Sequence, residues 1–296
     1  MTRVEIVEVG PRDGLQNEPR ILPAETKLEL IDRACAAGLR RIEVTSFVHP
    51  ARVLQLADAE AVAAGLPAHR GVEFSALVLN ERGYDRALAA GIRSVNTFVA
   101  TTDSFSTRNQ GLTVEETLAI VAALRARAAA DGIVLAVTIG TAFGCPFEGE
   151  VPAETLATVL ARVAALVPRE IALADTIGVA VPSDVEERLA LAVEISPAAT
   201  LRFHFHNTRN TGIANAVAAV RAGARVLDAS LAGIGGCPFA PAATGNVATE
   251  DLVYALERMG YDTGVSLERA AETARWIAGE LGIEPPGMVA RAGGFP

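Results

Sequence analysis

Short runs of aliphatic residues recur along the chain, and turn-forming residues follow each run. Eight runs predict β-strands, at residues 4–9, 41–45, 72–79, 94–99, 134–139, 170–174, 201–206 and 225–231. Between these runs the apolar residues fall at helical spacing, as at Leu156, Val159, Leu160 and Val163. The pattern therefore predicts that strands and helices alternate throughout the chain.

Several predicted helices carry start and stop signals. Helix starts are indicated by residues that precede an acidic first turn, namely Pro23, Thr113, Pro152 and Pro182. Helix ends are indicated by glycines that stand before the next strand, namely Gly38, Gly91, Gly132 and Gly223. These signals support the alternation of strands and helices.

Eight strand–helix units without a linker predict a single (β/α)8 barrel, a TIM barrel, over residues 1–296. A doubly wound protein of two domains is the alternative, but its glycine-rich phosphate turn after the first strand is replaced by the sequence GPRDG at 10–14. After the eighth unit, residues 266–281 predict an additional C-terminal helix. Residues 285–294, rich in proline and glycine, predict a loose tail.

Composition narrows the class of protein. The chain has 35 acidic and 26 basic residues and a net charge of -9, which argues against nucleic acid or an anionic membrane as a partner. Its apolar stretches are broken before the ~18 residues that a membrane-spanning helix needs, and residues 1–10 do not resemble a signal peptide. Three cysteines make no disulfide framework, so we expect thiols in a reducing cytoplasm.

Reactive side chains stand where the predicted strands end, and the active site of such a barrel lies at the C-terminal ends of its strands. They are Arg12, Asp13, Glu43, Asp175, His204, His206, Cys237 and Asn246. We therefore expect potential metal ligands, acids and bases to gather on one face of the barrel.

His204 and His206 are the most specific feature among them. Residues two apart on a strand point to the same side, so both imidazoles can reach one cation. The alternative is that two polar side chains at a strand end bond to their neighbours. With two of the four histidines placed here, metal binding is favoured, with oxygen ligands from Asp13 and from Asn246 or Glu43. A mixed nitrogen and oxygen site suits Mg²⁺ or Mn²⁺.

The neighbouring charges each have two interpretations. Arg12 and Asp13 are either a surface ion pair or a metal ligand beside an oxyanion-stabilising guanidinium, and their place after the first strand favours the second. Glu43 lies inside an apolar strand, so it needs a partner or acts as a base. For Asp175, a role in a turn and a catalytic role are equally supported.

A glycine-rich loop at 233–239 carries Cys237, which suits proton transfer if its pKa is tuned. The string GCPF also occurs around Cys145, so the string alone does not identify a catalytic cysteine. Cys35 lies on the apolar face of the first predicted helix and is expected to be a packing residue.

Longer motifs carry a resemblance to a known family. They are VEVGPRDGLQNE at 7–18, EVTSFV at 43–48, DTIGV at 175–179, the His-x-His pair, GGCPFA at 235–240 and GNVATED at 245–251. Together they resemble 3-hydroxy-3-methylglutaryl-CoA (HMG-CoA) lyases, which are barrel enzymes related to Claisen-type synthases. The resemblance runs nearly from end to end.

The resemblance implies a retro-Claisen cleavage that releases acetyl-CoA and a keto acid, acetoacetate. It implies that Asp13, His204, His206 and Asn246 hold Mg²⁺ or Mn²⁺. Roles for the remaining residues are implied in the same way: Arg12 stabilises the enolate, Cys237 takes part in proton transfer, Glu43 and Asp175 support deprotonation, and Gln16 and Glu250 support the site.

Two departures from the family pattern bear on the substrate. NTRN follows the second histidine where the family tends to have DTYG, and AVT at 136–138 stands where it tends to have RGY. Losing a cation and a phenol, the latter at Thr138, should alter how the acyl carboxylate is held. Citramalyl-CoA or a longer 3-hydroxyglutaryl derivative is therefore an alternative substrate, and Arg209 is a candidate replacement for the lost cation.

Three functions are weighed: a metal-dependent acyl-CoA lyase, a Claisen-type acyltransferase or synthase, and a non-catalytic ligand-binding barrel. The synthases usually carry a further region for which 296 residues leave no room, and nothing in the predicted metal set is missing. The lyase is therefore favoured. The resemblance also implies a homodimer.

Overall fold

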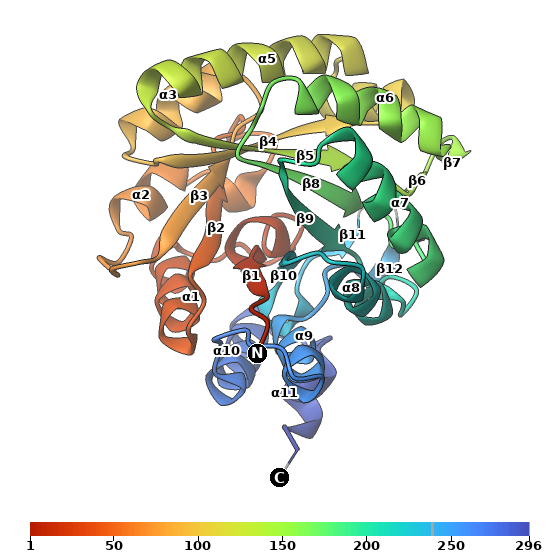
Figure 1. The fold of residues 1–296 in the computed structure, drawn as a ribbon. Coiled ribbons are helices and arrows are strands. Elements are labelled where there is room, and N and C mark those ends of the chain that lie inside the picture. Colours follow the sequence, from red (N-terminus) through yellow and green to blue (C-terminus); the bar gives the residue numbers. More distant parts are fainter. Residues whose placement is uncertain (238–239, 296) are drawn as a thin grey trace.

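Eight parallel strands close into a barrel in the computed structural model of the chain (Figure 1). Around the barrel they run β1 (Glu5–Glu8), β10 (Val226–Ala229), β9 (Thr200–Phe205), β8 (Glu170–Asp175), β5 (Val134–Gly140), β4 (Ser94–Ala100), β3 (Glu73–Leu77) and β2 (Arg41–Ser46). The structure describes residues 1–237 and 240–295, and of Cys237 and residues 240–244 it describes the backbone alone. The predicted barrel fold is confirmed, and the ends of the predicted strands differ from the observed ends by at most two residues.

Helices surround the barrel and connect the strands (Figure 1). They are α1 (Ala24–Ala37), α2 (Ala59–Ala64), α3 (Glu81–Ala89), α4 (Asp103–Gln110), α5 (Val114–Asp131), α6 (Ala153–Ala164), α7 (Pro182–Ile195), α8 (Gly212–Arg221), α9 (Thr249–Arg258), α10 (Leu267–Leu281) and α11 (Met288–Ala292). Short elements add to the loops: the π-helical turn η1 (Gly10–Gly14), the 3-10 turns η2 (Leu54–Leu56) and η3 (Leu231–Gly233), and two small hairpins, β6 (Gly144–Cys145) with β7 (Gly149–Glu150) and β11 (Gly236–Cys237) with β12 (Ala240–Thr244). No helix within residues 1–237 and 240–295 is long and apolar enough to cross a membrane.

The start and stop signals in the sequence act as expected. The Thr113 hydroxyl accepts a hydrogen bond from the backbone N–H of Glu116, and the Glu116 carboxylate accepts one from the N–H of Thr113, which together form a capping box. All four predicted glycine caps have positive φ angles, from 67° at Gly132 to 118° at Gly223. Local sequence therefore fixes both ends of several helices.

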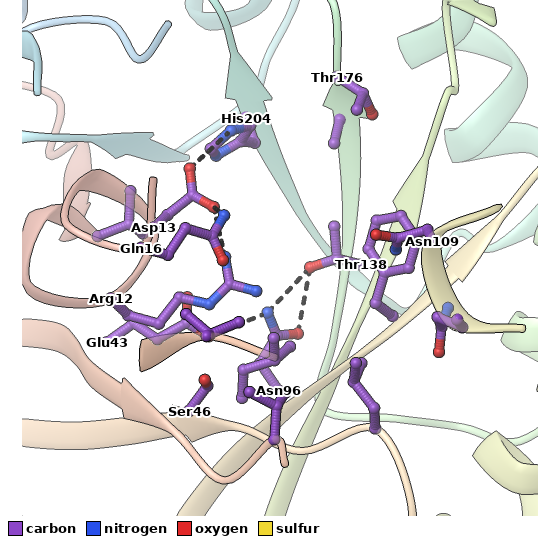
Figure 2. Close-up of a pocket in the computed structure, with 18 of the residues that line it drawn as sticks. Arg12, Asp13, Gln16, Glu43, Ser46, Asn96, Asn109, Thr138, Thr176 and His204 are labelled. Atoms are coloured by element: carbon purple, nitrogen blue, oxygen red, sulfur yellow. Dashed lines mark hydrogen bonds and ion pairs between the residues drawn. The ribbon is translucent and has the colours of Figure 1, made fainter. Parts of the chain in front are cut away.

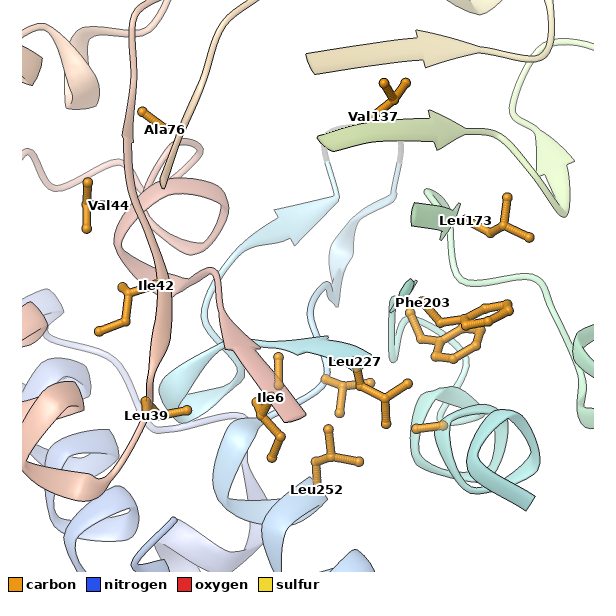
Figure 3. Close-up of a cluster of buried hydrophobic side chains, with 14 of the residues drawn as sticks. Ile6, Leu39, Ile42, Val44, Ala76, Val137, Leu173, Phe203, Leu227 and Leu252 are labelled. Carbon is orange, nitrogen blue, oxygen red and sulfur yellow. The ribbon is translucent and has the colours of Figure 1, made fainter. Parts of the chain in front are cut away.

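Alternate strand residues divide between two environments. Outward-facing residues pack under the helices in the main hydrophobic core, among them Ile42, Val137, Leu173, Phe203 and Leu227 (Figure 3). The intervening positions face the barrel interior, and many of them are polar or charged: Arg41, Glu43, Asn96, Glu170, Arg202 and Asp228 are all buried. The interior of the barrel is therefore a polar network, and this network supports the site described below.

The C-terminal segment packs on the barrel. Helix α10 contacts α1, α9 and η3, and thus lies beside the point where the last strand closes on the first. Residues 288–292 differ from the predicted loose tail, since they form α11 and bury Val289 and Ala290. The Asp251 carboxylate on α9 accepts hydrogen bonds from the backbone N–H groups of Met288 and Val289, which fixes the start of α11.

Candidate active site

A cavity of about 750 Å³ lies at the C-terminal ends of the strands. Its lining includes residues of η1, β2, β4, β5 and β9, and Figure 2 shows Arg12, Asp13 and Glu43 on one side of it and Thr138 on another. This is the face at which the sequence predicts the chemistry.

The turn η1 places Arg12 and Asp13 at the cavity. The carbonyl oxygen of Val9 accepts hydrogen bonds from the backbone N–H groups of Arg12, Asp13 and Gly14, so three successive residues wrap around one strand-end acceptor. Pro11 is the second residue of this turn, where its missing N–H costs nothing. The tight turn directs both charged side chains into the cavity.

Asp13 is surrounded by donors. Its Oδ1 accepts hydrogen bonds from the Arg12 guanidinium and from Gln16 Nε2 at 2.9 Å, and its Oδ2 accepts one from Asn246 Nδ2 at 3.0 Å. The Nε2 of His204 lies 3.9 Å from the same Oδ2. Gln16 thus lies beside Asp13, and its contact restrains the Asp13 carboxylate.

His204 and His206 lie side by side, with ring centroids 5.1 Å apart. His204 Nδ1 lies 3.1 Å from Asp228 Oδ2, and because an ionised carboxylate only accepts, Nδ1 carries the proton of this hydrogen bond. In the neutral ring the other nitrogen, Nε2, then presents its lone pair toward Asp13. One ligand atom from each of Asp13, His204 and His206 lies within 4.8 Å of the others.

Asn246 is the fourth candidate ligand, and it lies beside Asp13. Its Nδ2 donates to Asp13 Oδ2 and, at 3.1 Å, to the carbonyl oxygen of Ile234. Its Oδ1 and the Nδ1 of His206 are buried and have no hydrogen-bond partner within the described part of the chain. A buried acceptor without a donor is costly, and a cation relieves that cost. The four residues therefore fit a divalent cation of the Mg²⁺ or Mn²⁺ type.

The pKa shifts of Asp13 and His206 favour the deprotonated forms in which ligands bind a metal, whereas the pKa shift of His204 has the opposite direction. Burial alone raises the pKa of Asp13, but Arg12, the two histidines and Asn246 hold that pKa below its ordinary value. Burial lowers the pKa of His206 to about 4, and a charged His204 adds to this shift. Burial lowers the pKa of His204 as well, yet its hydrogen bond to Asp228 and the charge of Asp13 raise the pKa overall.

Glu43 forms a second link at the cavity. Its Oε2 lies 3.7 Å from Arg12 Nε, and its Oε1 accepts a hydrogen bond of 3.3 Å from Asn96 Nδ2. Burial raises the pKa of Glu43, although Arg12 and Arg202 oppose this shift. Asn96 in turn exchanges hydrogen bonds of 3.0 and 3.1 Å with the Thr138 hydroxyl (Figure 2). The Glu43 carboxylate, which lies in an apolar strand, is therefore paired with Arg12 and Asn96, as its position predicts.

Three predicted site residues, Asp175, Glu250 and Arg209, belong neither to the cavity lining nor to the candidate metal ligands. Asp175 accepts hydrogen bonds from the backbone N–H groups of Val179 and Ala180, which is the turn role that the sequence left as an alternative. Glu250 is fully buried under η3 and accepts a hydrogen bond from the N–H of Ala232. Arg209 donates to the carbonyl oxygens of the loop after β8, at Ile177 and Gly178, so it does not replace a cation in the cavity.

The side chain of Cys237 lies outside the described residues. The preceding Gly236 lines the cavity, and its carbonyl oxygen accepts a hydrogen bond from Asn17 Nδ2 at 3.2 Å. Gly235 has a φ of 108°, and a Cβ atom at this position would lie 2.6 Å from Asn246 Nδ2. Glycine at 235 therefore lets the loop approach Asn246, one of the candidate metal ligands, closely.

Several buried polar residues of this site were missed by the sequence analysis. Asp228 bonds to His204, Asn96 bonds to Glu43, and Arg202 lies beneath them in the barrel. For Arg202 and Asp228 a signal was present, because each stands as a charged residue in an apolar strand on the inward-facing side. Asn96 is uncharged, and its position carries no comparable signal.

Comparison with known proteins gives the family. The sequence profile described as HMGL-like matches residues 3–277. The chain is 43% identical to an (R)-citramalyl-CoA lyase of Chloroflexus aurantiacus, over 99% of this chain and 96% of that protein. It is 40% identical to a hydroxymethylglutaryl-CoA lyase of Bacillus subtilis, over 96% of this chain and 95% of that protein.

Solved structures agree with this assignment. The HMG-CoA lyase of Bacillus subtilis has a TM-score of 0.94 and 40% identity, covering 97% of this chain and 96% of that chain. An HMG-CoA lyase of Acinetobacter baumannii, solved with coenzyme A and 3-methylmalate, has a TM-score of 0.94 and 35% identity, covering 99% of this chain and 95% of that chain. The predicted resemblance is thereby confirmed. The chain belongs to the HMGL-like family and, within it, to the carbon–carbon lyases.

Proposed function

We propose that this lyase depends on a divalent cation and cleaves HMG-CoA into acetyl-CoA and acetoacetate by retro-Claisen chemistry. The observation that carries the proposal is the convergence of Asp13, His204 and His206 beside Arg12 at the cavity, with Asn246 hydrogen-bonded to Asp13. The HMG-CoA lyases at about 40% identity support the substrate. Mg²⁺ or Mn²⁺ is the proposed cofactor, and an acyl-CoA thioester is the proposed partner.

The reaction requires one proton to leave and one to arrive. Loss of the proton from the C3 hydroxyl converts the C3–O bond into a carbonyl, breaks the C2–C3 bond and leaves the electron pair on C2 as a thioester enolate. A proton delivered to C2 then gives acetyl-CoA. A bound divalent cation supplies a Lewis acid that lowers the pKa of the hydroxyl.

Glu43 is the proposed acceptor of the hydroxyl proton. It lines the cavity, and burial raises its pKa, which brings a carboxylate closer to the range that suits a general base. Arg12 is proposed to stabilise the enolate oxygen, because its guanidinium lines the same cavity between Asp13 and Glu43. Gln16 is proposed to orient Asp13 through the hydrogen bond that it donates.

Cys237 is the proposed donor of the proton to C2. Its neighbour Gly236 lines the cavity, and a thiol with a lowered pKa is a suitable acid. We assign Asp175 and Glu250 supporting roles only, since their carboxylates accept hydrogen bonds from backbone N–H groups of the loops around the site.

Citramalyl-CoA is the second candidate substrate. It carries its carboxylate directly on C3, whereas HMG-CoA has one additional methylene group, and both release the same acetyl-CoA enolate. The 43% identical relative is named for this substrate, and Thr138 presents a short side chain to the cavity. One methylene group changes selectivity by about 10- to 200-fold in a fitted pocket, so the two substrates are experimentally distinguishable.

The test is acetyl-CoA release from purified, Mg²⁺-loaded protein, measured with HMG-CoA and with both enantiomers of citramalyl-CoA. We expect release from HMG-CoA, loss of activity with EDTA, and recovery when Mg²⁺ or Mn²⁺ is added. Faster release from citramalyl-CoA would favour the second candidate. No release from either thioester would contradict the proposed lyase, and condensation of acetyl-CoA with a 2-oxo acid would favour the synthase instead.

The homodimer and the cytoplasmic location stay predictions. Sedimentation of the purified protein and fractionation of the cells that produce it test them directly. Neither enters the chemistry described above.

A further inference from the structure

Arg202 lies beneath the cavity and has no part in the chemistry proposed above. It stands on β9 two residues before His204, so both side chains point into the barrel. The Arg202 residue is 4% exposed. A guanidinium this deeply buried requires several partners, and their identity indicates what it does.

The three nitrogens of this guanidinium face three other strands. Nε lies 3.4 Å from Asp228 Oδ1 on β10, and Nη1 lies 3.2 Å from Glu170 Oε1 on β8. Nη2 donates to the Thr138 hydroxyl on β5 at 3.4 Å. The two carboxylates compensate the charge, while the third contact fixes a neutral hydroxyl in the cavity wall.

On one side Arg202 is linked through Asp228 to the candidate metal ligand His204. The Asp228 carboxylate lies between the two residues, with Oδ1 toward Arg202 and Oδ2 on His204 Nδ1 at 3.1 Å. Carboxylates behind a metal-bound histidine fix its ring orientation and tautomer, and their loss typically lowers metal affinity. Arg202 therefore restrains the carboxylate that restrains His204.

On the other side Arg202 reaches the opposite wall. The Thr138 hydroxyl bonds to Asn96, Asn96 donates to Glu43, and Glu43 lies beside Arg12. The contacts thus form a closed ring around the base of the cavity, made of Arg202, Thr138, Asn96, Glu43, Arg12, Asp13, His204 and Asp228. Within this ring, Arg202 joins the metal side to the wall that carries Thr138.

We propose that Arg202 is a positioning residue, which fixes Asp228 behind the metal ligand His204 and also fixes Thr138 in the wall that determines acyl selectivity. The inference rests on the proposed function, since it takes the metal site and the acyl-CoA substrate from there. It goes further by coupling metal affinity and acyl selectivity through one side chain. Variants that separate these two properties test it.

Four variants make the test, each loaded with Mn²⁺ and checked for folding by circular dichroism. In Arg202→Met we expect a loss of Mn²⁺ affinity of about 10- to 100-fold, measured by the electron paramagnetic resonance signal of free Mn²⁺. We also expect a changed ratio of kcat/KM between HMG-CoA and citramalyl-CoA. Thr138→Val should change this ratio and leave Mn²⁺ affinity at the native value.

Arg202→Lys separates the two effects. An ammonium group still pairs with Asp228, so part of the Mn²⁺ affinity returns, but a single point charge does not replace the fork that also holds Thr138. Arg41→Met is the matched control, because Arg41 is a buried guanidinium that also pairs with Glu170 and has no contact with Asp228 or Thr138 among the described interactions. It should lower thermal stability and change neither readout.

Two outcomes would overturn the inference. One is a folded Arg202→Met protein with native Mn²⁺ affinity and native selectivity. The other is an Arg41→Met protein with the same losses, which would indicate general loosening of the barrel. If Arg202→Met does not fold, Arg202→Lys and Thr138→Val decide by the same two readouts. A native protein that binds no Mn²⁺ and cleaves neither thioester would instead contradict the proposed function itself.

Discussion

Asp228 and His204 come from neighbouring strands, β10 and β9, and meet at 3.1 Å between a carboxylate oxygen and the Nδ1 of the ring. This contact assigns the Nδ1 proton and leaves Nε2 with its lone pair toward Asp13. The two residues are 24 positions apart in the sequence, and the parallel pairing of β9 with β10 brings them together.

Asp228→Asn should lower Mn²⁺ affinity by about 10- to 100-fold, because it removes the charge that holds the His204 tautomer. Titration of the protein with Mn²⁺, followed by electron paramagnetic resonance, measures this loss. Asp262→Asn is the control, since Asp262 pairs with Arg3 at a solvent-exposed site. Equal affinities of the Asp228 variant and the native protein would refute the role given to Asp228.

Glu43→Gln should lower kcat by about 10²- to 10⁴-fold, the usual contribution of a general base. A base acts in its ionised form, so in the native enzyme kcat/KM should rise with pH through the raised pKa of Glu43. Glutamine does not titrate, and this acidic limb should disappear from the pH profile of the variant. A variant that keeps both the rate and the limb would exclude Glu43 as the base.

Asp175→Asn should behave differently, because both Asp175 oxygens accept hydrogen bonds from backbone N–H groups. An amide keeps only one acceptor oxygen, so we expect a loss of unfolding free energy of about 1–3 kcal/mol and a nearly native kcat. Thermal unfolding and steady-state kinetics measure the two quantities. A large fall in kcat without a loss of stability would restore Asp175 to the catalytic set.

Glu250 should make the stability of the fold depend on pH. Burial raises its pKa to about 8, well above the value of 4.5 expected in the unfolded chain. As pH rises from 4.5 through 8, the unfolded chain has released this proton while the folded protein still holds it, so the free energy of unfolding falls over this window. The stability of Glu250→Gln relative to the native protein should therefore be greater at pH 8.5 than at pH 5.5.

Melting temperatures of the native protein and the Glu250 variant at the two pH values measure this difference. The exposed Glu268 provides the matched control, and Glu268→Gln should follow the native pH dependence. A slope of reduced size should remain in Glu250→Gln, because burial also raises the pKa of Glu8 to about 7. An unchanged slope in Glu250→Gln would show that Glu250 is ionised in the folded protein.

Much of the fold was predictable from the sequence because the information is local. Strand ends, glycine caps and the helix start at Thr113 depend on neighbouring residues, and they are confirmed. Helix α11 was missed because its start is fixed by Asp251, 37 residues earlier in the chain than Met288. Long-range capping of this kind leaves no signal in the segment itself.

The candidate site was predictable where charge conflicted with an apolar strand. Glu43 was found in this way, and the same reasoning applied to Arg202 and Asp228 would have found both. The role of Asp175 depends on the path of the backbone after β8, which decides whether its oxygens meet N–H groups or the cavity. The Arg209 side chain was interpreted as a replacement for the cation that the family pattern loses here, and its contacts with two carbonyl oxygens do not support this interpretation.

The central claim is that one divalent cation is held by Asp13, His204, His206 and Asn246. The most direct measurement is anomalous diffraction at the manganese absorption edge, from crystals of the native protein grown with Mn²⁺. The account predicts an anomalous difference peak that contacts these four side chains. A peak at another location, or none at a Mn²⁺ concentration that supports full activity, would contradict it.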